Sequence, residues 1–305
     1  MPWYGARMIS ALIASSLLLF APPQYDPILY QLGSTWDKSP VTESMLTTAS
    51  PAFQRAALAT AFIPVAGGTA FYLGKFNGVH VIATNHHVCE TGPQCLGFDL
   101  NFPLLQKTYR LDRWLGTFKD IDLTLMTFQV PAADEALLAP LAANFSFQKD
   151  VRLGEKLTTI GFGVAGNPTR QMVGDSGDDC RVLSGTAEYR LLHDPDAMNP
   201  MPDPVWSFAA GCDVSHGDSG SAMIDRETGE VMGILWTGKT PKSPKVQNST
   251  YLESLLAAPN EEVWTELSYA VPAAKMASSI YTYAYHYPYM TPEVQATLLK
   301  IIEQP

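Results

Sequence analysis

The chain has 305 residues, of which 46% are hydrophobic and 16% charged, enough apolar material for one large domain or two small barrels. Its 20 lysines and arginines against 30 aspartates and glutamates give a formal net charge of -10 at pH 7. This balance argues against nucleic-acid binding, which needs a basic surface, and gives no reason to expect electrostatic docking on an anionic membrane.

Residues 1–21 are predicted to be a secretory signal peptide. Arg7 supplies a positive start, and 8–20 is an apolar run too short for an ordinary transmembrane helix. The alternative is an uncleaved anchor, because the ending at Ala21 is a poor cleavage site. No later stretch is apolar enough to span a bilayer. We therefore expect a secreted or periplasmic protein, without stable membrane association once the signal is cleaved.

Residues 22–60 are interpreted as an N-terminal extension or propeptide, and 61–285 as the main domain. Within that domain, turn-rich gaps separate short apolar runs that predict strands and two hairpins: 67–73 with 79–84, 123–128, 156–163, and 221–225 with 231–236. Helix signals occur only late, at 272–280 and, after a Thr-Pro start, up to 302 in the tail at 286–305. Many short strands without helices between them indicate a barrel or sandwich.

The strongest chemical motif is Gly-Asp-Ser-Gly-Ser at 217–221, which leads directly into a strand. Nucleophilic acyl transfer needs an activated hydroxyl and donors for the oxyanion, and the backbone amides of Gly217 and Ser219 would supply those donors beside the Ser219 hydroxyl. The same tetrapeptide, Gly-Asp-Ser-Gly, occurs at 174–177 but continues into a charged turn. Context therefore favours Ser219 over Ser176.

Two upstream segments offer a base and an acid. Thr-Asn-His-His-Val at 84–88 ends an apolar strand, and Asp120-Ile-Asp122 precedes another. A lone histidine is more often structural, but here the order histidine, aspartate, serine fits a triad.

These segments resemble those of the chymotrypsin/trypsin-like serine proteases, in the bacterial branch of glutamyl endopeptidases and periplasmic trypsin-like peptidases. The histidine directly before Val88 then corresponds to the catalytic one, which selects His87 over His86. The family's acid directly precedes an apolar strand, which selects Asp122 over Asp120. The resemblance implies an all-β fold of two six-stranded antiparallel barrels, the first at about 61–150 and the second at about 151–270, with a C-terminal helix at about 272–282.

An exported protein with four cysteines favours two disulfides. Neighbouring positions suggest Cys89 with Cys95 and Cys180 with Cys212, and the resemblance supports the second pair. A zinc site at His86, His87, Cys89 and Cys95 is the competing interpretation, but the spacing is not one that zinc sites use. We expect no metal and no cofactor.

The resemblance leaves two acidic residues unexplained. Asp218 would be held by a freshly cut N-terminal ammonium in the animal branch, so here it either pairs with a lysine or arginine from elsewhere or belongs to a zymogen. Asp213 stands where trypsin has the acidic floor of its specificity pocket, and Trp236, Thr237 and Gly238 are expected to line that pocket. Leu235 occupies the position of the pocket histidine of glutamyl endopeptidases, which argues against cleavage after glutamate.

The resulting prediction is a secreted serine endopeptidase acting on protein or peptide substrates through His87, Asp122 and Ser219. A non-catalytic protease homologue that acts as a binding module is the alternative. An esterase is disfavoured, because 217–221 lacks the last glycine of a nucleophile elbow and strands do not alternate with helices.

Overall fold

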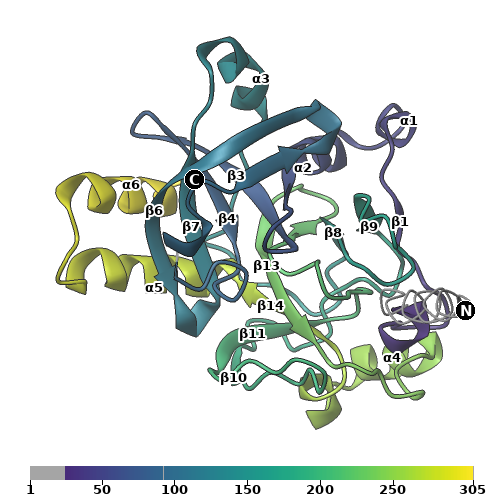
Figure 1. Ribbon diagram of the computed structural model, residues 1–305. Coiled ribbons are helices and arrows are strands. Elements are labelled where there is room, and N and C mark those ends of the chain that lie inside the picture. The colour runs from purple at the N-terminus through teal and green to yellow at the C-terminus, as the bar shows by residue number, and fades with distance from the viewer. Residues whose placement is uncertain (1–24, 92, 305) are drawn as a thin grey trace, which may run out of the picture.

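The computed structural model describes residues 25–91 and 93–304, so the predicted signal peptide lies outside the described residues. Two β-structures pack against each other, with the strands of the first in blue and most strands of the second in teal and green (Figure 1). The all-β prediction of two antiparallel barrels followed by helix is confirmed.

The first barrel is closed and has six strands. In barrel order they are β2 (Thr60–Ile63), β3 (Gly68–Phe76), β4 (Val79–Thr84), β7 (Leu123–Phe128), β6 (Lys107–Phe118) and β5 (Asp99–Phe102). Phe62 of β2 pairs with Asn101 of β5 and closes the ring. The β3–β4 hairpin turns at Asn77 and Gly78, whose φ values of 48° and 84° suit the tight turns that match strand twist.

The second β-structure contains eight strands. Their order is β1 (Ser39–Pro40), β9 (Val173–Asp175), β8 (Leu157–Gly161), β12 (Ala222–Asp225), β13 (Val231–Gly238), β14 (Ser268–Pro272), β11 (Val205–Ala210) and β10 (Arg190–Leu192). The six strands from β9 to β11 are the predicted barrel strands, and β1 and β10 extend the ends. The segment after β9 bridges the two sides of this sheet, because the Val182 N–H donates to Glu155 O just before β8 and the Leu183 N–H donates to Ala209 O in β11, each at 2.9 Å.

Six α-helices lie among the described residues. They are α1 (Glu43–Leu46), α2 (Pro51–Ala59), α3 (Glu135–Leu138), α4 (Ser249–Ala257), α5 (Ala273–His286) and α6 (Pro292–Ile302). Helices α5 and α6 lie side by side and pack on β3, β13 and β14 (Figure 1). Helices α2 and α4 were not predicted, although Ser50 and Asn248 cap them with side-chain oxygens.

Short 3-10 helices connect several of these elements. They lie at Pro27–Leu29, Pro93–Cys95, Pro103–Leu105, Lys119–Ile121, Ala132–Asp134, Ala139–Leu141 and Glu261–Trp264. Within residues 25–91 and 93–304, no helix combines the length and the apolar character that crossing a membrane requires.

The apolar core fills each barrel and continues between them. Tyr72 and Ile82 are fully buried inside the first barrel, and Phe208 inside the second. Phe71 and Ile234 belong to a third cluster that joins the two barrels and includes residues of α5. Burying one large apolar side chain contributes about 1.5–3 kcal/mol, so this joint cluster holds the barrels in a fixed relation.

Candidate active site

The predicted base and acid are in contact at one end of the first barrel. His87 follows β4 and Asp122 directly precedes β7, and these strands are paired neighbours. Nδ1 of His87 lies 2.7 Å from Oδ2 of Asp122, and the His87 backbone N–H donates to Oδ1 at 2.9 Å. Strand pairing thus joins two residues that are 35 positions apart in the sequence.

Asp122 has an unusual and well-supported backbone. Its φ of 38° lies in the left-handed region, which residues other than glycine seldom adopt. Its carbonyl accepts hydrogen bonds from Asn85 Nδ2 at 2.9 Å and from the His86 N–H at 3.0 Å. Its side chain is 0% exposed, and the carboxylate has the partners that burial requires in the backbone N–H and the ring Nδ1 of His87.

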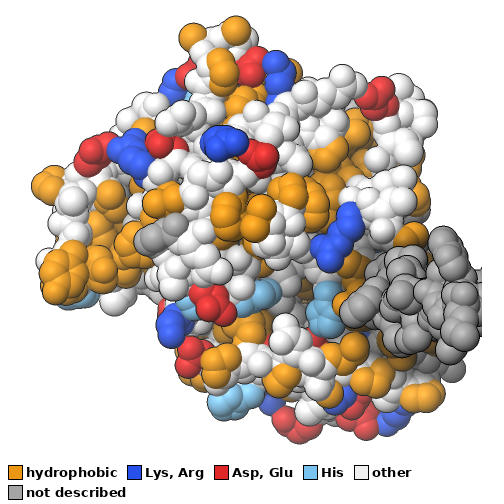
Figure 2. All heavy atoms as spheres, in the orientation of Figure 1, with side chains coloured by type: hydrophobic (Ala, Val, Ile, Leu, Met, Phe, Trp, Pro, Cys, Tyr) orange, Lys and Arg blue, Asp and Glu red, His pale blue; other side chains and the backbone are white. Residues whose placement is uncertain are grey.

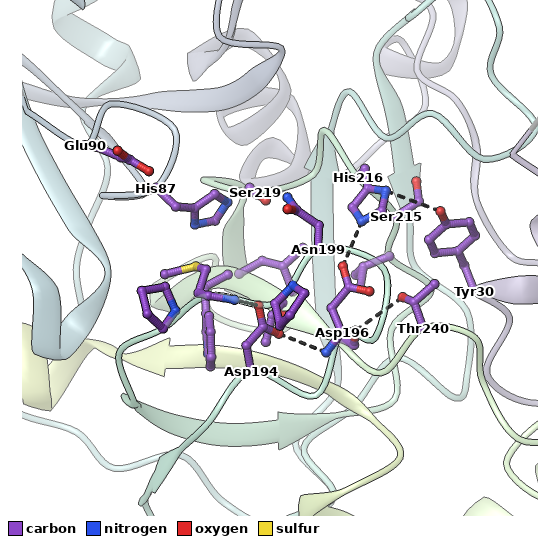
Figure 3. A pocket seen from close by; sticks show the side chains of 18 residues that line it. Tyr30, His87, Glu90, Asp194, Asp196, Asn199, Ser215, His216, Ser219 and Thr240 are labelled. Atoms are coloured by element: carbon purple, nitrogen blue, oxygen red, sulfur yellow. Dashed lines mark hydrogen bonds and ion pairs between the residues drawn. The ribbon is translucent and has the colours of Figure 1, made fainter. Parts of the chain in front are cut away.

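The surroundings of His87 raise its pKa above the ordinary value. Burial of the ring acts to lower the pKa, but the charge of Asp122 and its hydrogen bond raise it by more, and Asp194 and Glu90 add to the rise. Because Nδ1 is bonded to Asp122, Nε2 is the ring nitrogen left to face a substrate. Figure 3 shows the ring turned toward Ser219, and both residues line one pocket.

Ser219 lies in a sharp turn before β12 that depends on two glycines. Gly217 and Gly220 have φ values of 95° and 89°. A Cβ on Gly217 would lie 2.6 Å from the Phe162 carbonyl oxygen, and one on Gly220 would lie 2.0 Å from that of Thr69. Only glycine fits both the conformation and the space. Within the described chain, Ser219 Oγ makes no hydrogen bond to His87, whose ring is bonded through Nδ1 to Asp122.

The peptide between His216 and Gly217 has a fixed orientation. The His216 carbonyl accepts from the Val164 N–H at 2.9 Å. In a trans peptide the N–H points opposite to the carbonyl, so the Gly217 N–H is directed away from Val164. Within the described chain, the N–H groups of Gly217 and Ser219 donate to no protein acceptor. They therefore remain available to bind an oxyanion.

Thr69 of β3 fastens this turn to the first barrel. Its N–H donates to the Ser219 carbonyl at 2.9 Å and its hydroxyl donates to the Gly217 carbonyl at 2.7 Å. The same hydroxyl accepts from the Phe162 N–H at 3.1 Å. These contacts fix the position of Ser219, the candidate nucleophile, relative to the first barrel, which carries the candidate base His87.

The residues that the sequence analysis ranked second lie elsewhere. Exposed Ser176 bonds Thr158 at 3.2 Å between hydroxyl oxygens. Exposed Asp120 accepts from Ser279 Oγ at 2.8 Å. His86 Nδ1 lies 2.7 Å from Thr117 Oγ1, and burial lowers the pKa of its ring.

A pocket of about 210 Å³ opens beside His87 and Ser219. The predicted residues Trp236, Thr237 and Gly238 line it, and Trp236 Nε1 donates to Ser207 Oγ at 3.0 Å. Figure 3 shows the acidic side chains of Asp194 and Asp196 together on one wall of the pocket, where Thr237 Oγ1 donates to Asp194 Oδ1.

The structure does not bring Asp213 into this pocket. Its side chain is buried, with Oδ1 accepting from the Leu32 N–H and Oδ2 from the Asp37 N–H, each at 2.7 Å. Both oxygens are therefore committed to the N-terminal segment. The expectation that Asp213 forms the acidic floor of the pocket is wrong, because the N-terminal segment, whose position was not predicted, donates hydrogen bonds to both carboxylate oxygens.

Several charged residues near the pocket were not predicted. His216 Nε2 lies 2.8 Å from Asp196 Oδ2, and Tyr30 OH lies 3.4 Å from His216 Nδ1. Lys242 Nζ donates to Ser268 Oγ at 3.2 Å, and burial lowers the pKa of this lysine to about 7. The one sequence signal for the acidic wall was the stretch 194–204, which is rich in aspartate and proline.

The four cysteines form the two predicted disulfides. Cys89 pairs with Cys95 and Cys180 with Cys212. Because both sulfurs near His87 are bonded to each other, they are not zinc ligands.

Comparison with known proteins found similar solved structures and one matching family model. A solved structure of Rv3671c from M. tuberculosis H37Rv, a serine-to-alanine mutant in an inactive form, superposes with a TM-score of 0.51 at 16% identity, covering 82% of this chain and 97% of that one. Two more structures of this protease, in inactive and active forms, give TM-scores of 0.49 and 0.47 at 17% identity, each covering 79% of this chain and, respectively, 95% and 86% of theirs. No curated protein matches the chain.

A family model for the trypsin-like peptidase domain matches residues 68–234, more than half of the chain, and the chain therefore belongs to the trypsin-like peptidase family.

Proposed function

We propose that this member of the family is an exported serine endopeptidase that hydrolyses peptide bonds through His87, Asp122 and Ser219. The observation that carries the proposal is the buried contact of Asp122 with His87, at 2.7 Å, beside the pocket that also contains Ser219. A nucleophile, a base and an acid that orients the base are the minimum for activated acyl transfer.

In this mechanism the Ser219 hydroxyl attacks the scissile carbonyl carbon and its proton passes to Nε2 of His87. Asp122 holds Nδ1–H and stabilises the imidazolium that forms. The carbonyl oxygen becomes an oxyanion and accepts hydrogen bonds from the N–H groups of Gly217 and Ser219. When the C–N bond breaks, the leaving amine takes the proton from His87 and the acyl group stays on Ser219 Oγ. Water then repeats the steps and releases the acid.

The substrate is expected to bind along the edge of β13. Trp236, Thr237 and Gly238 lie beside the pocket, and their extended backbone offers donors and acceptors to an extended peptide. Since Asp213 is bonded to backbone N–H groups of the N-terminal segment, a preference for arginine or lysine does not follow from it.

Export is supported by the two disulfides. Such bonds persist in oxidising compartments and are rare in the cytosol. The predicted signal peptide at 1–21 supplies the route.

A serine-reactive fluorophosphonate tests the proposal directly. We expect one adduct per folded chain, mapped by mass spectrometry to the peptide that contains Ser219, with loss of peptide hydrolysis in proportion to labelling. Heat-denatured protein serves as the control and should take no label, because the hydroxyl is reactive only beside His87. A folded protein without an adduct, or with the adduct at Ser176, would refute the proposed mechanism.

A further inference from the structure

A buried ion pair links the N-terminal segment to the residue before Ser219. Lys38 Nζ contacts Asp218 Oδ2, and the two side chains are only 2% and 1% exposed. Within the described residues, Lys38 Nζ has no other hydrogen-bond partner. The lysine side chain is thus committed to this one carboxylate. The sequence had left open whether Asp218 meets a cation from elsewhere in the chain, and the structure identifies Lys38.

Asp218 organises the turn that carries the candidate oxyanion donors. Its Oδ1 accepts from the Gly163 N–H at 3.0 Å and its Oδ2 from the Ser215 N–H at 2.8 Å. Val164, next to Gly163, is the residue whose N–H fixes the His216 carbonyl and hence the direction of the Gly217 N–H. The position of the Asp218 carboxylate therefore sets the orientation of that peptide.

The backbone around Lys38 is clamped on both sides. Asp213, at the start of the same turn, accepts from the N–H groups of Leu32 and Asp37. Directly after Lys38, strand β1 pairs with β9, and the Val41 N–H donates to the Met172 carbonyl at 2.9 Å. Lys38 is thus held at a fixed distance from the turn by contacts on both sides of it in sequence.

A third contact ties this segment to the residue next to Gly217. Tyr30 is 1% exposed, and its ring meets the His216 ring edge-on with centroids 5.9 Å apart. The N-terminal segment therefore contacts residues 213, 216 and 218 of the turn, and within the described residues its ion pair with the turn is the contact of Lys38 with Asp218.

We propose that Lys38 is a positioning residue for the oxyanion site: its ammonium supplies the internal counter-charge that keeps the Asp218 carboxylate buried and the Gly217 N–H directed at the substrate. The proposal rests on the proposed function. Because the ammonium belongs to a side chain within the continuous chain, residues 25–41 are part of the working enzyme and no N-terminal cleavage is needed to form the site.

Charge balance explains why removal of this ammonium affects the site. Without it, Asp218 would remain as a buried carboxylate with two backbone N–H donors and, among the described residues, no other ion-pair partner, a strongly destabilising state that favours movement of the group toward water. As Asp218 moves, the Gly163 and Ser215 contacts break and the peptide at Gly217 loses its support. The effect falls on the transition state, where the Gly217 N–H is used, and less on substrate binding.

The experiment compares the full-length secreted protein with three variants. In Lys38→Met we expect kcat to fall by about 10²-fold, the scale for loss of one oxyanion donor, with KM changed little. In Lys38→Met/Asp218→Asn the uncompensated charge is gone, and kcat should recover at least about tenfold over the single variant. Lys245→Met is the matched control, since it removes an exposed ion pair to Glu262 and should leave kcat unchanged.

Intact mass of the fluorophosphonate-labelled protein provides a reading that does not depend on how well a variant folds. The labelled species should contain residue 38. A labelled form that begins after residue 38, or a Lys38→Met enzyme as active as the Lys245→Met control, would overturn the role of Lys38 and leave the proposed function standing. A wild-type protein that neither takes label nor hydrolyses peptides would instead refute the function.

Discussion

The same tetrapeptide, Gly-Asp-Ser-Gly, occurs twice in this chain with two different structures. At 174–177 it ends strand β9, and its glycines have no positive φ. At 217–220 it forms the turn before β12, where both glycines have positive φ. Four identical residues therefore adopt a strand end in one place and a sharp turn in the other.

The surroundings of the two aspartates differ as much as the backbones. Asp175 accepts from the Gly177 N–H and the Asp213 N–H and lies beside a second buried carboxyl group. Asp218 accepts two backbone N–H groups and also meets the ammonium of Lys38. The tetrapeptide specifies neither arrangement. Contacts with distant segments decide which serine lies near a base.

Replacement of the two serines tests this comparison most strongly. Ser219→Ala should lower kcat by about 10⁶-fold, the scale for removal of a triad nucleophile. Ser176→Ala removes a surface hydroxyl bond to Thr158 and should change kcat less than about twofold. Steady-state kinetics on one peptide substrate, with folding checked by circular dichroism, measures both. A greater loss in Ser176→Ala would reverse the assignment.

The glycines give the next largest contrast. Gly217→Ala places a Cβ 2.6 Å from the Phe162 carbonyl oxygen at a φ of 95°, so the peptide must rotate and its N–H leaves the oxyanion position. We expect kcat to fall by about 10²–10³-fold. Gly174→Ala makes its closest contact with the Val41 side chain, at 3.1 Å, and should leave kcat unchanged. Equal kcat values in the two variants would show that the Gly217 N–H is not used.

Sequence alone predicted the features that short segments determine. The β3–β4 hairpin, the apolar runs of β7 and β8 and the hairpin of β12 and β13 follow from local patterns, although β3 continues to Phe76 through most of the gap expected at 74–78. The contact of His87 with Asp122 was also predicted, because each residue adjoins its own strand and resembles the corresponding family segment. Helix α4 was overlooked, although Asn248 before it is a capping residue.

Contacts between distant segments could not be predicted. Lys38 and Asp218 are 180 positions apart (218 − 38), and no periodicity or motif at 25–41 indicates which residue its lysine meets. The error at Asp213 has the same origin. A family position placed its carboxylate in the pocket, whereas the N–H groups of Leu32 and Asp37 bind both oxygens.

The pH dependence of activity tests the role of His87, which lies beside the tetrapeptide at 217–220 and not beside the one at 174–177. His87 must be neutral to accept the Ser219 proton, so activity falls about tenfold per pH unit below its pKa. Asp122 raises that pKa despite burial, so the midpoint of the acidic limb should lie above about 6.5, the ordinary value for histidine. The measurement is kcat/KM against pH, with tryptophan fluorescence reporting folding. A midpoint near pH 4 in folded protein would indicate a carboxylate base instead.

The smallest expected effect concerns stability at the first tetrapeptide. Burial raises the pKa of both Asp175 and Asp213, and the charge of Asp175 raises that of Asp213 further. A carboxyl group with a raised pKa binds its proton more tightly in the folded state, so the stability it contributes is fully present near pH 4 and is lost as the pH rises through the raised value. The free energy of unfolding should therefore decline between about pH 4 and pH 7, and the ionisation of Asp175 should account for about 1 kcal/mol or more of that decline.

Asp175→Asn isolates that contribution, because an amide does not titrate. The variant loses one acceptor oxygen for the Gly177 and Asp213 N–H groups and should be the less stable protein at pH 4. Its deficit should shrink toward pH 7, where the wild-type carboxyl group must ionise while buried. Asp178→Asn is the control. Asp178 is exposed and Lys156 lowers the pKa of its carboxyl group, so the stability difference between this variant and the wild type should not shrink from pH 4 to pH 7. Urea unfolding of the three proteins at pH 4, 5.5 and 7 measures the trend. A deficit in Asp175→Asn that widens with pH would mean that Asp175 is ionised and well solvated in the fold, and would remove this difference between the two tetrapeptides.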